Sequence, residues 1–434
     1  MQGAEKRKKV LMIAYQFPPM GGSGVQRTTK FVKYLRLFGW EPVVFTRDIK
    51  GMDLVDHSLM QDVPSDVKVC RTKAYDPTSL KGPLMYLGKF LGRKVFIPDS
   101  ERLWQIMSLS AAKRVIKDES PDIIYSTSYP YSDHLLALHL KKQFPHIPWV
   151  ADFRDEWTNN PYLLDNPHSH FRMNIEKRME KDVLLNADYL ITNTPVMLDN
   201  FIKNNQEIEN IDKKFCYIPN GYDEEDFKGI NFKKKPSQKF TMTYAGLLYG
   251  RRKSDTLFEA IYSLISEGKI KNKNIIVRLI GNYKMNYING LIDKFNLRDI
   301  VEVMPYMPHN ECILKLAESD VLLHIEGSGP GGEAFYSGKI FEYMNMKRPV
   351  IAIIPPSGAA AQLIKQVKIG SVSDFNSVED IKNNILYYYN QWLQGEIQYE
   401  PDYELIAKYE RKHLTGQLAN IFDDLLKKHG GRFL

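Results

Sequence analysis

Hydrophobic residues along this chain fall into short runs rich in valine and isoleucine, separated by longer stretches with apolar residues at helical spacing. This alternation is typical of parallel sheets covered by helices on both faces. In the first half of the chain it predicts strands at 9–15, 41–46, 67–71, 122–127, 149–152, 189–193 and 215–219. It predicts helices at 24–38, 101–119, 133–143 and 171–186.

The same alternation restarts after a polar, lysine-rich stretch. The second half predicts strands at 240–245, 275–280, 301–304, 321–325 and 350–354, and helices at 254–267, 287–295, 310–319, 339–345 and 359–367. We therefore predict an α/β protein with two Rossmann-like, doubly wound parallel-sheet domains facing a central cleft. The expected parts are an N-terminal domain at 1–222, a linker at 223–239, a C-terminal domain at 240–400 and a helical segment at 401–434.

The composition is that of an ordinary globular protein. The chain has 434 residues, too many for one ordinary core, with 43% hydrophobic and 26% charged residues. Cys70, Cys216 and Cys312 are widely separated, which argues against a disulfide framework and for a reducing, cytoplasmic compartment. No Asp-x-Asp motif, His-x-x-x-His pair or Cys/His cluster appears, so we expect no metal and no other cofactor.

The charge pattern favours small anionic partners over nucleic acid. The net charge is +7, but the cations are dispersed and do not interleave with aromatic residues. No apolar stretch is long enough to span a membrane. The segment at 84–96 mixes large apolar residues with three cations, which fits peripheral contact with an anionic membrane and fits equally a helix docked on its own domain.

The stretch from Ser337 to Tyr343 carries the strongest local signal for a ligand. It places Gly338 and Lys339 at the start of a predicted helix, where exposed amide groups attract phosphate and a glycine allows close approach. Glu342 lies three residues after Lys339, on nearly the same helical face, and could accept both hydroxyls of a ribose. A well-capped helix with a solvated lysine and glutamate would have the same sequence.

Two other glycine turns follow predicted strands. Gly21 and Gly22 open the first helix and could present backbone amides to an anion, although Arg27 stands near the third glycine of a dinucleotide fingerprint, so that fingerprint is incomplete. A tight turn without a ligand fits this first loop as well.

The second turn opens the second half of the chain. It joins Gly246 to three consecutive cations, Arg251, Arg252 and Lys253, just before a helix. That arrangement predicts an anion site by local electrostatics, and a solvated basic turn is the alternative. A glycine-rich loop at 327–332 could close over the same ligand.

Polar residues also follow the fourth and fifth strands. His134 falls in the first turn of a helix near the predicted cleft, where proton transfer, a sugar contact and a partly buried helix position are all open. Asp152 and Arg154 lie on one side of an extended strand beside Trp157. A carboxylate and guanidinium pair next to an indole is suited to carbohydrate binding, and the alternative is an ion pair that supports a loop.

Several motifs together resemble the retaining glycosyltransferases of family 4, which have the GT-B architecture. The resemblance covers nearly the whole chain, and its motifs occur in the family's order. The residues that carry it are Gly21–Gly24, Asp152–Asp155, Ile218–Asp223, Arg251 with Arg252, and Lys339 with Glu342.

The resemblance implies a nucleotide-diphosphate sugar as donor, bound mainly to the second domain, and a glycan or lipid-linked acceptor bound mainly to the first. Gly246, Arg252 and Lys339 would line the diphosphate, Glu342 would hold the ribose, and amides near Gly21 and Gly22 would approach the donor from across the cleft. Asp152, Arg154 and His134 would belong to the catalytic side. The last helix would return to the first domain, and the anomeric configuration would be retained.

The chain departs from the family pattern at three places. Ala334 stands where the family commonly has the first of two glutamates, with Glu333 one residue out of register. Leu257 and Phe258 replace a lysine that often follows the diphosphate arginine, so that Lys253 or Lys339 would have to substitute. Tyr131 stands where relatives often carry a histidine.

We therefore predict a glycosyltransferase of polysaccharide or cell-envelope biosynthesis. Two other functions stay open: a sugar-nucleotide epimerase, which can share the two-domain architecture, and a catalytically silent sugar-nucleotide-binding protein. Released nucleotide separates the three, because transfer requires an acceptor, epimerisation leaves a changed free sugar and a binding protein gives neither.

Overall fold

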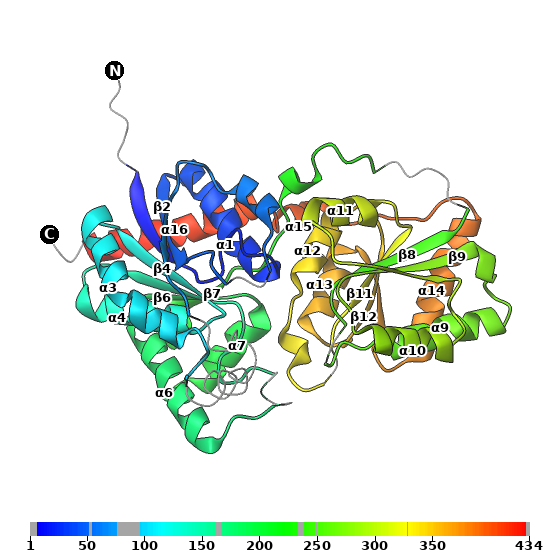
Figure 1. The fold of residues 1–434 in the computed structure, drawn as a ribbon, viewed down its shortest axis with the longest axis horizontal. Helices are drawn as coiled ribbons and strands as arrows, with labels where there is room; N and C mark the ends of the chain where they lie inside the picture. The colour runs from blue at the N-terminus through cyan, green and yellow to red at the C-terminus, as the bar shows by residue number, and fades with distance from the viewer. Residues whose placement is uncertain are drawn as a thin grey trace. The chain divides into compact units, whose positions relative to one another are not determined.

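The computed structural model describes residues 7–51, 54–75, 96–161, 163, 166–232, 238–248, 250–327 and 329–430 (Figure 1). Residues 84–95 of the segment at 84–96, for which membrane contact was one interpretation, lie outside the described residues. The chain forms two compact units, the first from residues 1–220 and 411–434 and the second from residues 221–410. Each unit contains one parallel sheet, which confirms the prediction of two parallel-sheet α/β domains.

The first unit is built on a seven-stranded parallel sheet in the order β3-β2-β1-β4-β5-β6-β7. Its strands are β1 (Lys8–Ile13), β2 (Trp40–Arg47), β3 (Lys68–Thr72), β4 (Ile123–Ser128), β5 (Trp149–Phe153), β6 (Tyr189–Thr192) and β7 (Phe215–Tyr217). Its helices are α1 (Ser23–Tyr34), α3 (Arg102–Glu119), α4 (Ser132–Gln143), α6 (His170–Asn186), α7 (Pro195–Asn204), α8 (Ile211–Lys214) and α16 (Arg411–Gly430).

Successive strands are added on one side of β1 as far as β3, and then on the other side from β4 onward. β1 and β4 therefore lie side by side, although β1 ends at Ile13 and β4 begins at Ile123. In doubly wound sheets, ligands bind beyond the carboxyl ends of the strands where the order reverses in this way. Both β4 and β5 are buried along their whole length, so their polar side chains need partners inside the unit.

The last helix belongs to the first unit. It packs beside α1 and contributes Leu414, Leu418 and Phe422 to the core of this unit (Figure 1). The ring of Phe422 contacts that of Trp40 at 5.1 Å between centroids. Burial of these apolar residues along one face of α16 holds the C-terminal segment on the N-terminal sheet.

The second unit has a six-stranded parallel sheet in the order β10-β9-β8-β11-β12-β13. Its strands are β8 (Phe240–Ala245), β9 (Ile275–Ile280), β10 (Val301–Met304), β11 (Val321–Ile325), β12 (Val350–Ile354) and β13 (Gly370–Asp374). Its helices are α9 (Asp255–Ser266), α10 (Met285–Lys294), α11 (His309–Ala317), α12 (Gly338–Asn345), α13 (Ala359–Val367), α14 (Val378–Leu393) and α15 (Tyr403–Ala407).

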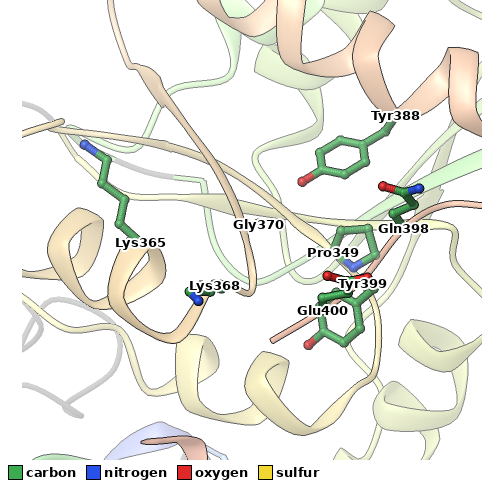
Figure 2. A pocket seen from close by; sticks show the side chains of 8 residues that line it. All are labelled: Pro349, Lys365, Lys368, Gly370, Tyr388, Gln398, Tyr399 and Glu400. Atoms are coloured by element: carbon green, nitrogen blue, oxygen red, sulfur yellow. The ribbon is translucent and has the colours of Figure 1, made fainter. Parts of the chain in front are cut away.

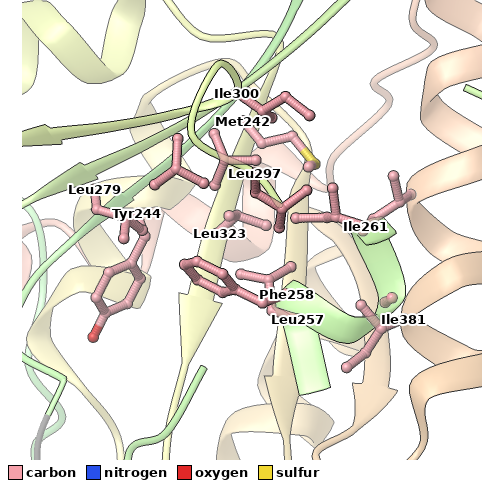
Figure 3. Packing of buried hydrophobic residues seen from close by; sticks show 14 of the residues in the cluster. Met242, Tyr244, Leu257, Phe258, Ile261, Leu279, Leu297, Ile300, Leu323 and Ile381 are labelled. Carbon is pink, nitrogen blue, oxygen red and sulfur yellow. The ribbon is translucent and has the colours of Figure 1, made fainter. Parts of the chain in front are cut away.

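Apolar side chains from both faces of this sheet pack against the covering helices. Figure 3 shows Met242 and Leu323 of the sheet against Phe258 of α9 and Ile381 of α14. The core fixes the strand ends of the unit, and with them the turns that follow β8 and β11.

The unit boundaries differ from those expected. Tyr222, the last residue of the expected N-terminal domain, and Phe227, in the expected linker, are buried in the core of the second unit. Ile406 of α15 is buried in that same core, so the second unit continues to residue 410 rather than 400. In the part of the chain that the structure describes, no helix combines the length and apolar character needed to cross a bilayer.

Candidate functional site

Asp152 lies inside the first unit, paired with Arg27 of α1. The guanidinium of Arg27 donates to both carboxylate oxygens, at 2.7 and 2.9 Å, and the two residues are 1% and 0% exposed. The remaining donor group of Arg27 binds the carbonyl of Pro219 at 2.9 Å, and the Tyr125 hydroxyl also donates to Asp152. In this buried ion pair, both oxygens of one carboxylate bind one guanidinium. It joins α1 to β5 and to Pro219, which follows β7.

The expected pairing of Asp152 with Arg154 is therefore wrong. The Arg154 side chain donates to the backbone carbonyls of Gly24, Ser128 and Tyr129, the last at 2.6 Å. Both side chains follow the strand alternation, but a helix that presents Arg27 already satisfies Asp152. Arg154 instead ties the glycine turn after β1 to the end of β4.

In the glycine turn of the first unit, one backbone amide already has a partner within the protein. Gly21 donates its N–H to the carbonyl of Leu54 at 2.9 Å. Gly22 adopts φ 102°, a conformation that favours glycine. It is the N-cap residue of α1, and no side chain caps the first amides of this helix. The first amides of α1 therefore stay the part of this turn best suited to an anion.

His134 lies in the interior of the first unit. It is 0% exposed, its Nδ1 is 2.8 Å from the Ser126 hydroxyl, and its ring contacts Phe153 at 4.4 Å between centroids. Burial lowers the pKa of His134 to about 3, so the imidazole is neutral at physiological pH. The placement fits a buried helix residue, and no part of the side chain reaches the surface of the unit.

In the second unit, Lys339 lies directly against Gly246. Gly246 follows β8 with φ 153°, and a Cβ at this position would lie 1.8 Å from the Lys339 ammonium. The ammonium also lies over the ring of Tyr244, 5.3 Å from its centroid. Glycine is therefore required at 246, because any side chain there would displace the cation at the start of α12.

Arg252 and Lys339 are brought together, as the sequence analysis expects. Burial, and after it the positive charge of Arg252, lower the pKa of Lys339 to about 8, while Glu342 opposes the change. Gly338 next to this lysine has open space where a Cβ would stand. Two cations close to each other, beside an accessible helix start, form a position suited to an anion with two phosphate groups.

Glu326 is a component of this site that the sequence analysis misses. It follows β11, is 3% exposed and accepts hydrogen bonds from His324 Nε2 and from the Ser337 N–H, both at 2.9 Å. Burial works to raise its pKa, but His324, the Ser337 amide and Arg252 lower it overall, so the carboxylate is ionised. Its Oε2 has no partner among the described residues. Glu326 thus fixes the start of α12.

Glu342 of α12 is paired with His309 at the start of α11. The distance from Nε2 to the carboxylate is 3.0 Å, and the side chains are 24% and 25% exposed. The carboxylate therefore has a fixed direction and is still open to a ligand, as a residue that holds ribose hydroxyls would need to be.

Arg251 and Lys253 lie in different surroundings from Arg252. Arg251 donates to the carbonyl of Pro330 at 2.8 Å and packs against Gly327 and Gly329, where a Cβ would approach it to 2.6 and 3.3 Å. Arg251 therefore positions the glycine-rich loop, while Lys253 is exposed.

The chain is similar to known proteins in part of its sequence and in its fold. Residues 22–226 match the family model for Glycosyltransferase Family 4. No curated protein matches the chain in sequence.

Three solved glycosyltransferase structures share the fold. Sucrose-phosphate synthase from Thermosynechococcus elongatus is 16% identical with a TM-score of 0.67, over 97% of this chain and 100% of that chain. The lipopolysaccharide outer core galactosyltransferase WaaB is 13% identical with a TM-score of 0.57, over 96% and 99%. WaaG, a glycosyltransferase involved in lipopolysaccharide biosynthesis, is 16% identical with a TM-score of 0.57, over 95% and 99%.

The family match includes Gly22, Arg27, Asp152 and Pro219, while the shared fold covers both units. Residues 22–226 therefore match the model of Glycosyltransferase Family 4, and the chain as a whole shares the GT-B fold of the solved glycosyltransferases.

Proposed function

We propose that this protein transfers a sugar from a nucleotide-diphosphate sugar to a glycan or lipid-linked acceptor in polysaccharide or cell-envelope biosynthesis. The donor binds the second unit, with the diphosphate at Arg252, Lys339 and the start of α12. Glu342 holds the ribose. The acceptor binds the first unit, and the reaction takes place in the cytoplasm.

One observation carries the donor assignment: the Lys339 ammonium lies against the backbone of Gly246, and Arg252 is close enough to depress its pKa. Two like charges held together without a ligand repel each other. A diphosphate removes this repulsion and gains the amides of α12 at the same time. The same charges would stabilise the diphosphate as it leaves the anomeric carbon.

The proposed transfer retains the anomeric configuration and uses no metal. Arg252 and Lys339 provide the positive charge that a divalent cation provides in other sugar transfers. Activity that persists in EDTA would support this part, and the anomer formed, read by NMR of the product, tests retention.

The function is tested first by ligand binding. Thermal-shift measurements with UDP, GDP and ADP should find one nucleotide that raises the melting temperature of the wild-type protein, because a ligand bound to the native state alone stabilises it. Arg252→Ala should remove that shift without changing the melting temperature of the unliganded protein. A wild-type protein that responds to none of the three nucleotides would contradict the proposal.

The reaction is tested next with the sugars of the nucleotide that binds. A transferase releases nucleotide faster when an acceptor glycan is added. Release of a changed free sugar without acceptor would identify an epimerase, and binding with no release in either case would identify a silent binding protein.

A further inference from the structure

Tyr129 is an exposed aromatic residue that directly follows β4 in the first unit. It is 39% exposed, whereas the neighbouring aromatic residues Tyr131 and Trp157 are only 7% and 1% exposed. β4 is one of the two central strands at which the strand order reverses, and ligands of doubly wound sheets bind beyond the carboxyl ends of such strands. Tyr129 is therefore the ring of this group that a ligand bound there can reach.

Contacts on two sides hold the Tyr129 side chain in place. Its ring meets that of Tyr131 edge-on, at 5.8 Å between centroids and 90° between planes, and Tyr131 in turn stacks on Trp157 at 4.6 Å. The Tyr129 hydroxyl donates to the carboxylate of Glu101 at 3.3 Å. A tyrosine has only two rotatable side-chain bonds, so a ring that is already held loses little conformational entropy when a ligand stacks on it.

Arg154 brings together groups from the ends of three strands. Its Nη2 donates both to the carbonyl of Tyr129, at 2.6 Å, and to the side-chain oxygen of Gln16, at 3.3 Å. Gln16 follows β1, Tyr129 follows β4 and Arg154 follows β5, so the three residues lie at the same edge of the sheet. Because one nitrogen contacts both groups, the Gln16 amide lies next to the backbone of Tyr129.

Gly24 leaves the space that the Gln16 side chain occupies. A Cβ at position 24 would lie 1.9 Å from the Gln16 side-chain oxygen and 3.5 Å from Nη1 of Arg154. Any larger residue would therefore displace Gln16 from Arg154. Gln16 is half-buried, and its amide nitrogen can donate to a ligand while its oxygen binds Arg154.

The charges around Tyr129 favour an uncharged ligand. The Glu101 carboxylate lies at the hydroxyl end of the side chain, and the Arg154 guanidinium lies at the backbone end. An acidic group would meet a like charge at Glu101, and an ammonium group would meet one at Arg154. A sugar ring has an apolar face and hydroxyls around its rim, so it can stack on the tyrosine and bond to a carboxylate and an amide.

We propose that Tyr129, Glu101 and Gln16 form the subsite for an uncharged sugar ring of the acceptor. The sugar stacks on the Tyr129 ring, the Glu101 carboxylate accepts a hydrogen bond from one hydroxyl, and the Gln16 amide donates to another. This assignment rests on the proposed transfer. It selects acceptors that present an uncharged sugar and disfavours those that present an acidic or an amino sugar.

The full-length protein is titrated with the methyl glycosides of glucose, galactose and mannose, and binding is followed by saturation-transfer difference NMR. The titration is made at about pH 6.5, where an amine is protonated and a carboxylic acid is ionised. At least one glycoside should bind. Its uronic acid and 2-amino analogues should bind about tenfold more weakly, because each brings a like charge to the site.

Variants of the tyrosine separate stacking from hydrogen bonding. Tyr129→Ala should weaken the preferred glycoside about tenfold, whereas Tyr129→Phe keeps the ring and should weaken it by no more than about threefold. The control, Tyr217→Ala, removes another tyrosine of the first unit, 45% exposed at the end of β7, and should change nothing.

Glu101→Gln and Gln16→Ala test the polar contacts. Each should weaken the preferred glycoside about threefold, because each alters one hydrogen bond to the sugar. Glu101→Gln should also remove most of the discrimination against the uronic acid, since the repelling charge is gone. A residue that only supports the fold would not change this preference.

The second unit offers another position at which a sugar could bind. Its pocket has a volume of about 310 Å³, and Figure 2 shows Tyr388, Gln398 and Tyr399 on the same side of it. Gln398→Ala changes this pocket and should leave the affinity for the glycoside unchanged. A loss of affinity in Gln398→Ala would place the sugar in the second unit and overturn the proposal.

Three further results would overturn it: no binding of any uncharged glycoside, a uronic acid that binds as tightly as the uncharged sugar, or equal affinities in Tyr129→Ala and Tyr217→Ala. Nucleotide affinity should be the same in all variants. A wild-type protein that binds a glycoside but no nucleotide would refute the proposed transfer. Nucleotide binding without glycoside binding would refute the subsite alone.

Discussion

The two units treat their charged residues in opposite ways. In the first unit, Arg27 and Asp152 neutralise each other in the core, and His134 is buried in its neutral form. In the second unit, Arg252 and Lys339 lie beside each other near an open helix start. Charge at a strand end is thus neutralised inside one unit, whereas in the other it forms the position that we propose for the donor.

This difference shows that residue type and strand position do not by themselves identify a functional group. Asp152 and Gly246 both mark the carboxyl end of a central strand, where the fold places ligands. What separates them is the partner: the buried guanidinium of Arg27 binds both oxygens of Asp152, while the cation at Gly246 lies close to a second cation.

The largest effect should come from breaking the ion pair in the first unit. Asp152→Ala leaves the Arg27 guanidinium buried without its carboxylate, which should cost about 3–5 kcal/mol of unfolding free energy. Urea denaturation of the full chain, followed by far-UV circular dichroism, measures the loss. A double variant, Arg27→Met with Asp152→Leu, should regain part of it. If Asp152→Ala instead keeps wild-type stability and loses transfer, Asp152 acts in the chemistry.

The next largest effect should come from removing a cation of the second unit. Lys339→Met should weaken binding of the nucleoside diphosphate by about 10- to 100-fold, because a charged hydrogen bond to phosphate is worth about 1.5–3 kcal/mol. Calorimetric titration with UDP and GDP measures this change. Lys253→Met is the matched control, since Lys253 is exposed in the same turn. Equal losses in both variants would mean that overall charge, and not the site, attracts the nucleotide.

The fold could be predicted well where strands consist mainly of apolar residues. β8, β9, β10, β11 and β12 have the bounds that the hydrophobic pattern predicts. The pattern missed β13, whose sequence Gly-Ser-Val-Ser-Asp has one apolar residue and lies at the sheet edge. Gly370 is needed there because a Cβ would come within 2.0 Å of the Val350 carbonyl, a packing reason that hydropathy does not record.

The candidate site could be predicted where its signal is local. Glycine, cation and carboxylate at the start of α12 lie within five residues of one another, so the sequence alone brings Lys339 and Glu342 together. Arg27 and Asp152 are 125 positions apart, and Glu326 depends on a bond to the Ser337 amide. Contacts of this kind appear only once the sheet brings the elements together.

The pairing of Arg252 with Lys339 also predicts a dependence on pH. The protonated Lys339 attracts the diphosphate, and its pKa in the free protein is about 8, so affinity should be full at pH 7 and fall as the pH rises through that value. The loss should approach tenfold for each further pH unit. Neighbouring Cys312 does not titrate in this range, because burial raises its pKa to about 11.

Lys339→Arg separates this titration from that of the nucleotide. Arginine stays charged throughout, so the variant should bind with an affinity that is nearly flat between pH 7 and 9. A fall of the same size in wild type and variant would show that another group, such as the base, causes it.

The smallest effect should come from His309, which acts through Glu342. The pair is about a quarter exposed, so water screens it. His309→Asn should therefore weaken binding of the nucleoside diphosphate by about threefold, which is within the 0.2–1 kcal/mol typical of such pairs. The loss should appear with UDP or GDP and be absent with the matching 2′,3′-dideoxy nucleotide, because the hydroxyls that Glu342 would hold are missing there. Equal losses with both ligands would mean that His309 supports α11 and α12 generally. The ribose would then have to be held by other residues of the second unit, while the diphosphate position at Lys339 would still stand.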